Sequence, residues 1–244
     1  MLPADDKKRP FKGLVWPGLI PGKLIKRYKR FLADVELDDG QYVTAHCPNS
    51  GSMKACSEPG RRVFLSHHDN PKRKLKYTWE LIEMPDSLVG VNTMIPNRLI
   101  YHSIQAGIIR ELAGFDSISS EVSTSKGTRL DLLLSTKNND RCYVEIKNCS
   151  LVEGNTAFFP DAITTRGLKH LIELQKIKKK KSRAVIFYLV QRMDADFFRP
   201  ASHIDREYAL ELARASKNGV EILVYDVAVD LETITIGKKL PYSL

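Results

Sequence analysis

The sequence predicts an α/β protein in two parts: a small N-terminal β-barrel, then a mixed sheet with helices on both faces. Up to about residue 96 the chain reads as short strands separated by turn residues, and beyond it helix-like and strand-like segments alternate. With 244 residues and 43% hydrophobic content, the chain is long enough to bury a core without disulfide or metal staples. We therefore expect domains over 1–96 and 97–244.

Five strand-like segments, separated by turn residues such as Asp39-Gly40 and Pro59-Gly60, predict the barrel. They are LIKRYKRFLADVEL (24–37), QYVTAHC (41–47), RRVFLSHH (61–68), LKYTWELIEM (75–84) and LVGVNTMI (88–95). This number and spacing of strands is typical of a small barrel of the OB type. Such barrels bind single-stranded nucleic acid through backbone charge and base stacking.

The first of these segments is basic and carries aromatic residues. A net charge of +9 already predicts an anionic partner, nucleic acid first. The residues that would bind it here are Lys26, Arg27, Tyr28, Lys29 and Arg30, followed by Phe31. The alternative is a solvated strand face with Tyr28 and Phe31 in the core, and the sequence leaves both interpretations open.

The second part predicts the order helix, three strands, helix, strand, helix, strand. The helices are expected over 97–113, 161–181 and 205–217 because their apolar residues recur at helical spacing. The strands are expected at 117–124, 129–135, 142–148, 183–191 and 220–229. The segment RAVIFYLVQ (183–191) is almost uninterrupted in its apolar character, which favours the buried centre of the sheet.

The hairpin RLDLLLSTKNNDRCYVEIKN (129–148) carries charges inside apolar strands. Side chains alternate faces along a strand, so Glu145 and Lys147 share one face, and pairing of the two strands would set Asp131 beside Glu145. Asp131 and Glu145 could hold one or two Mg²⁺ or Mn²⁺ ions through hard oxygen ligands, with the Ile146 carbonyl as a further ligand.

This set predicts metal-dependent phosphodiester cleavage. The ion would polarise the phosphate and activate a water, while the ammonium of Lys147 would orient that water and stabilise the developing negative charge. We expect Asp131, Glu145 and Lys147 to be the catalytic residues. The alternative is a salt-bridged patch on a polar sheet face.

Other charged residues are weaker candidates. Glu121 is a possible third metal ligand or a surface glutamate, and Asp161 is expected to cap a helix rather than bind metal. Arg166, Lys169 and His170 share one helix face and would clamp a phosphate if that face overlooks Glu145; otherwise they form a solvated face.

The four cysteines form no CxxC pair, which argues against a zinc ribbon or a redox motif and favours reduced, buried thiols. The first ten residues, MLPADDKKRP, lack the apolar core of a signal peptide, and no window has the roughly 18 consecutive apolar residues of a membrane span. We expect a cytoplasmic protein that does not bind membranes.

The chain resembles the sugar fermentation stimulation protein A (SfsA) family. The resemblance runs from about Lys23 and is carried by collinear segments that include AHCPNSGSM, RKLKYTWELIE, VNTMIPNRLI, TRLDLLL, CYVEIKNCSLVE and FFPDAITTRGLKHLIEL. It implies a cytoplasmic, DNA-binding protein linked to the regulation of sugar use. It also implies an OB-like domain followed by a PD-(D/E)XK restriction-endonuclease-like domain.

On the residues of this chain, the nuclease motif of the family falls on Asp131, Glu145 and Lys147. The resemblance also shows departures: His102 stands where an acidic residue is common, which bears on a second metal. Thr165 stands in place of Glu, and Ser50 in place of Thr.

Two functions from different classes are consistent with these residues. The first is a Mg²⁺-dependent DNA nuclease in which the OB-like domain holds the strand and the second domain cuts it. The second is a non-catalytic DNA-binding transcriptional regulator of sugar metabolism that keeps the nuclease fold. RNA is a weaker candidate partner. Cutting both strands of a duplex would require two active sites, so a homodimer is a further hypothesis.

Overall fold

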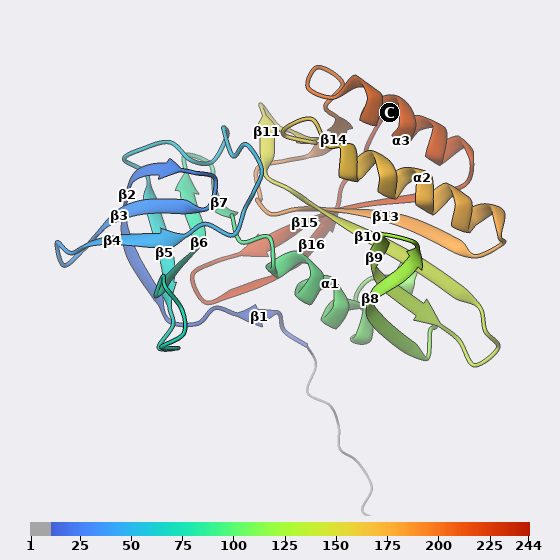
Figure 1. Ribbon diagram of the computed structural model, residues 1–244, viewed down its shortest axis with the longest axis horizontal. Coiled ribbons are helices and arrows are strands. Elements are labelled where there is room, and N and C mark those ends of the chain that lie inside the picture. The colour runs from blue at the N-terminus through green and yellow to red at the C-terminus, as the bar shows by residue number, and fades with distance from the viewer. Residues whose placement is uncertain (1–10) are drawn as a thin grey trace, which may run out of the picture.

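The computed structural model describes residues 11–244, which form two domains side by side (Figure 1). The expectations for residues 1–10, including the interpretation of MLPADDKKRP, lie outside the described residues. In the described part, no helix is long and apolar enough to cross a membrane.

The predicted N-terminal barrel is confirmed. Its strands follow the order β4-β3-β2-β5-β6-β7, and a parallel pairing of β4 with β6 closes the barrel. The core is fully buried and includes Val35, Leu65 and Trp79. The bounds are β2 (Leu19–Tyr28), β3 (Leu32–Leu37), β4 (Tyr42–His46), β5 (Arg62–His67), β6 (Tyr77–Met84) and β7 (Ser87–Gly90).

The prediction of one strand over 24–37 is wrong. The chain turns back between Tyr28 and Leu32, which pair as neighbours in the β2–β3 hairpin. Lys29 and Arg30 form the turn with φ values of 48° and 64°. Glycine or asparagine is usual in this left-handed region, so two basic residues gave no turn signal.

The second domain contains the expected mixed sheet, with strand order β1-β16-β15-β13-β10-β9-β8. The strands β10, β13 and β15 run parallel, and β9 and β16 pair antiparallel with them on either side. The bounds are β1 (Leu14–Val15), β8 (Ser117–Ser125), β9 (Thr128–Ser135), β10 (Arg141–Cys149), β13 (Arg183–Val190), β15 (Glu221–Val229) and β16 (Thr233–Lys239). A small sheet adds β11 (Leu151–Glu153), β12 (Thr156–Phe159) and β14 (Phe197–Pro200).

Helices cover both faces of the large sheet, as predicted. Helix α1 (Ile95–Gln105) lies on one face, and α2 (Thr165–Lys179) and α3 (Arg206–Lys217) lie together on the other (Figure 1). The helix expected from residue 161 begins at Thr165, because the hydroxyl of Thr164 accepts the backbone N–H of Gly167 as its cap.

The segment before the barrel belongs to the second domain. Strand β1 pairs with β16 at the edge of the large sheet, and the buried Trp16 donates its indole N–H to the carbonyl of Asp230 over 3.0 Å. The chain therefore enters the barrel from the second domain and returns to it at α1.

Candidate active site

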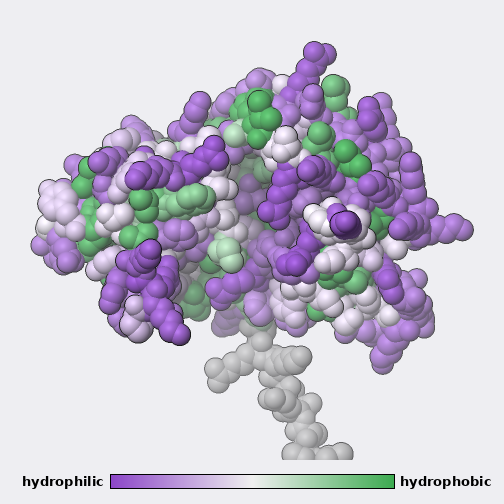
Figure 2. All heavy atoms as spheres, viewed as in Figure 1, coloured by the Kyte–Doolittle hydropathy of each residue, from purple (hydrophilic) through white to green (hydrophobic). Residues whose placement is uncertain are grey.

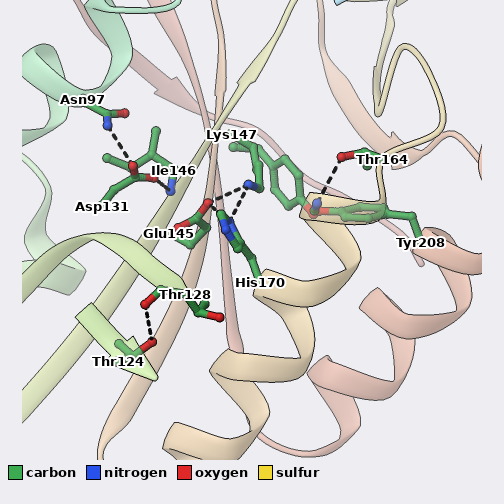
Figure 3. A network of polar contacts seen from close by, with 12 residues as sticks. Asn97, Thr124, Thr128, Asp131, Glu145, Ile146, Lys147, Thr164, His170 and Tyr208 are labelled. Atoms are coloured by element: carbon green, nitrogen blue, oxygen red, sulfur yellow. Dashed lines mark hydrogen bonds and ion pairs between the residues drawn. The ribbon is translucent and has the colours of Figure 1, made fainter. Parts of the chain in front are cut away.

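The side-chain carboxylate of Asp131 continues the hydrogen bonding between β9 and β10 where their backbone pairing ends. The last paired residues are Leu132 and Val144, and beyond them the backbone N–H of Ile146 donates to Oδ2 of Asp131 over 2.7 Å. The amide of Asn97, near the start of α1, donates to Oδ1 over 2.9 Å (Figure 3). Two donors from separate elements therefore fix this carboxylate.

Glu145 and Lys147 point to the same side of β10, and Figure 3 shows both turned toward the ring of His170 on α2. The ammonium of Lys147 donates to Oε1 of Glu145 over 2.6 Å and lies 3.2 Å from Nδ1 of His170. Nδ1 of His170 also contacts Oε1 of Glu145. Only 2% of Glu145 is exposed, so its charge is compensated mainly by these two side chains.

The pKa values of the Asp131 and Glu145 carboxyl groups are shifted in opposite directions. Burial, reinforced by the nearby charge of Glu145, raises the pKa of Asp131 to about 6, although the Ile146 N–H and Asn97 oppose the shift. Burial also disfavours ionisation of Glu145. The hydrogen bond from His170 and the charge of Lys147 outweigh it and hold the pKa of Glu145 below its usual value. Such paired acids with divergent pKa values are typical of functional sites.

The donor set fits a hard divalent cation. Oε2 of Glu145 is buried and has no hydrogen-bond partner in the described structure, which is unfavourable unless another group satisfies it. Within residues 11–244, no three His, Cys, Asp or Glu side chains are grouped to hold a metal. Asp131 and Glu145 with the carbonyl of Ile146 would therefore be the protein ligands, and Mg²⁺ usually keeps several waters in such sites.

Glu121 does not join this pair. Its exposed carboxylate forms an ion pair with Arg129 at 3.4 Å across the β8–β9 hairpin. Both residues line a cavity of about 670 Å³ together with Arg166, Lys169 and His170 of α2. Of the three α2 residues, His170 therefore reaches Glu145, whereas Arg166 and Lys169 lie at the cavity.

The basic residues of the first barrel strand are divided among different roles. The guanidinium of Arg27 donates to the carbonyls of Asn49, Gly51, Ser52 and Arg30 over 2.8–3.1 Å. The hydroxyl of Tyr28 donates to Asp34 over 3.1 Å, and Lys26 lies 3.6 Å from the same carboxylate. Lys29 and Arg30 are exposed in the turn. Arg27 thus supports a loop, and the expected continuous basic strand is not formed.

Asp161 does not cap α2, contrary to the prediction. Its Oδ2 accepts hydrogen bonds from the hydroxyl of Ser52 over 3.2 Å and from the backbone N–H of Met53 over 3.1 Å. Both donors lie on the barrel loop that follows β4. Asp161 therefore joins the two domains.

Sequence reasoning missed two amides that support the site. Asn97 donates to Asp131. Gln191, the residue after β13, donates to Oδ1 of Asn148 over 2.7 Å, and Asn148 directly follows Lys147 on β10. Asparagine at a helix start after proline is commonplace, and Gln191 ends an apolar strand. Neither residue has a local pattern that distinguishes it, because the contacts join segments far apart in the chain.

Comparisons with known proteins agree with this architecture. A family model described as the sugar fermentation stimulation protein RE domain matches residues 94–233, and one described as the SfsA N-terminal OB domain matches residues 25–91. A sugar fermentation stimulation protein homolog of Geotalea uraniireducens is 54% identical over 91% of this chain and 96% of the relative. A homolog of Pelobacter propionicus is 51% identical over 93% of this chain and 99% of the relative.

A solved structure has the same fold throughout. The structure of Pyrococcus furiosus SfsA in complex with Ca²⁺ superposes with a TM-score of 0.88 at 25% identity, over 96% of this chain and all of the other. Two matched domains, relatives about half identical over nearly their full length, and this shared fold all agree. The chain belongs to the sugar fermentation stimulation protein family.

Proposed function

We propose that this protein is a metal-dependent DNA phosphodiesterase, in which the N-terminal barrel holds the strand and the mixed-sheet domain cuts it. The observation that carries the proposal is the buried, unpartnered Oε2 of Glu145, set beside Asp131 and Lys147 at the end of the β9–β10 ladder. The Ca²⁺ complex of the Pyrococcus furiosus relative supports a divalent cation here, which we expect to be Mg²⁺ or Mn²⁺.

The residues of the chain have distinct tasks in this reaction. A bound divalent cation would supply a Lewis acid and would lower the pKa of a coordinated water. Asn97 and the N–H of Ile146 orient the carboxylate of Asp131. His170 and Lys147 hold Glu145 ionised, and the Lys147 ammonium is placed to stabilise negative charge that develops on a phosphate.

The surface around the site supports an anionic polymer as substrate. Arg129, Arg166 and Lys169 line the cavity that His170, the partner of Glu145, also lines. A second cavity, between the domains, is lined by the exposed cations Arg30 and Lys54, among others. Figure 2 shows a recess between the two domains, with hydrophilic side chains gathered on both sides of it. A strand that entered both cavities would meet cations in each of them.

The test compares wild type with the Asp131→Ala/Glu145→Ala double variant. Mn²⁺ and Mg²⁺ are titrated by calorimetry, and end-labelled single- and double-stranded DNA reports cleavage under the same conditions. We expect metal binding and cleavage by wild type alone. If both proteins bind DNA equally and neither binds metal nor cuts, the proposal is wrong, and the protein is a DNA-binding regulator that keeps the nuclease fold.

Two parallel measurements define the partner and the assembly. Matched single-stranded RNA tests the DNA preference, because both polymers share the phosphate charge but differ in the 2′-hydroxyl. Sedimentation with and without DNA tests the homodimer expected of an enzyme that cuts both strands. A monomer in both conditions would restrict the activity to one strand at a time.

A further inference from the structure

The phosphodiesterase proposal uses the cations of the cavity between the domains, but it does not account for the size or the apolar lining of that cavity. We propose that it takes one unpaired nucleotide of the bound DNA strand, next to the phosphate held at the triad. DNA with an unpaired nucleotide at this point would then bind better than continuous duplex. This inference rests on the proposed function, and it names the structural class of its substrate.

The cavity begins one residue beyond Lys147 on β10 and ends one residue before α2. Asn148 and Ser150, which follow Lys147 on and just beyond β10, line one side. Thr164 lines it too, and the next residues, Thr165 and Arg166 of α2, line the cavity that His170 also lines. A DNA strand whose phosphate lies at Lys147 would therefore place a neighbouring nucleotide at this opening.

The wall contributed by the barrel is rigidly built. The loop after β4 is held from one side by the guanidinium of Arg27, which binds the carbonyls of Asn49, Gly51 and Ser52. Asp161 of the other domain binds Ser52 and Met53 from the opposite side. A Cβ on Gly51 would lie 2.6 Å from Oδ2 of Asp161, so any larger residue would displace this carboxylate from its present position. The cavity is therefore preformed by contacts between the two domains.

The lining is suited to a nucleotide. Phe158 and Ile163 supply apolar surface, and 77% of Ile163 is exposed. The exposed cations Arg30 and Lys54 lie at the same cavity. Apolar surface beside cations matches a nucleobase joined to its phosphate, as in proteins that stack unpaired bases. The carboxylate of Asp161 is already engaged by two donors, which reduces its repulsion of a phosphate.

The volume limits what can enter. The cavity measures about 580 Å³, within the range of sites that enclose one drug-sized ligand. A nucleotide is of this size, whereas the stacked pairs of a duplex are not. A base in the cavity must therefore have left the stack, which is least unfavourable where it has no partner to lose.

The test measures binding in EDTA, so that cleavage plays no part. The probes are a fluorescein-labelled continuous duplex and the same duplex with one extra, unpaired 2-aminopurine. We expect wild type to bind the second probe at least about 10-fold more tightly and to change the 2-aminopurine emission. Ile163→Asp should remove most of this preference while leaving affinity for the continuous duplex close to that of wild type.

A matched control is Leu210→Asp, which makes the same charge change at a residue of α3 that is 58% exposed. It should keep the full preference. Equal binding of both probes by wild type, or an undiminished preference in Ile163→Asp, would overturn the nucleotide site while leaving the phosphodiesterase proposal standing. Absence of DNA binding together with absence of metal-dependent cleavage would overturn both.

Discussion

Arg27→Lys tests whether Arg27, a half-buried cation of the barrel, supports a loop or binds DNA. Lysine keeps the charge but lacks the planar fork, and its single nitrogen would reach one or two of the four carbonyls that Arg27 now binds. Each lost hydrogen bond contributes about 1 kcal/mol net, so the free energy of unfolding should fall by about 2–3 kcal/mol. In a chain of this length that corresponds to a midpoint lowered by roughly 4–12 °C.

Two assays make the distinction, with Lys54→Gln as the comparison. Thermal denaturation followed by circular dichroism should show the lower midpoint for Arg27→Lys and little change for Lys54→Gln, whose side chain is exposed. The slope of log K against log salt for single-stranded DNA should be unchanged in Arg27→Lys. It should be smaller by about 0.7 in Lys54→Gln if Lys54 contacts a phosphate. A wild-type midpoint for Arg27→Lys with a reduced salt slope would refute the loop-supporting role.

Three further changes test the second domain. Asn97→Ala removes a donor to Asp131 and should weaken Mn²⁺ binding roughly 10–100-fold in calorimetry; undiminished binding would contradict its supporting role. Tyr208→Phe leaves the buried hydroxyl of Tyr188 without its hydrogen-bond partner, which now lies 2.6 Å away. The free energy of unfolding, measured in urea, should fall by about 1–3 kcal/mol. The double Tyr→Phe variant should lose less, and a larger loss would refute this account. Burial raises the pKa of Asp226 from 3.8 to about 6, so the folded state binds the proton more tightly and stability falls as pH rises between those values. In Asp226→Asn, the urea midpoint of unfolding should fall less over this pH range. An unaltered pH dependence would mean that other groups cause the fall.

The sequence was most informative where structure follows from local pattern. Strand alternation correctly placed Glu145 and Lys147 on one side of β10, and the apolar run of 183–191 correctly marked a central strand. The break in 24–37 was missed because Lys29 and Arg30 take left-handed φ values without the usual turn residues. The short strand β14 was missed because it pairs with β12, which lies far from it in the chain.

In the candidate site, too, residues with a local signal were predicted, and contacts between distant segments were not. Asp131, Glu145 and Lys147 were identified because charge inside an apolar strand is unusual, although their catalytic role is still a prediction. The role of Asp161 was predicted wrongly, because a carboxylate near the start of a helix is normally a cap. The groups that donate to it lie more than a hundred residues earlier in the chain. Arg27 likewise looked like a nucleic-acid contact until the loop that it binds was located.

The path of the chain through β1 determines how the barrel can move. The barrel is connected to the second domain at both of its ends, because β1 is part of the large sheet and α1 packs on it. A domain on one tether can swing in any direction, but one on two tethers can only rotate about the line that joins them. Any opening of the recess between the domains would therefore follow a single hinge axis. Deleting the residues up to Trp16 would free this motion and would also leave β16 as a bare sheet edge prone to intermolecular pairing.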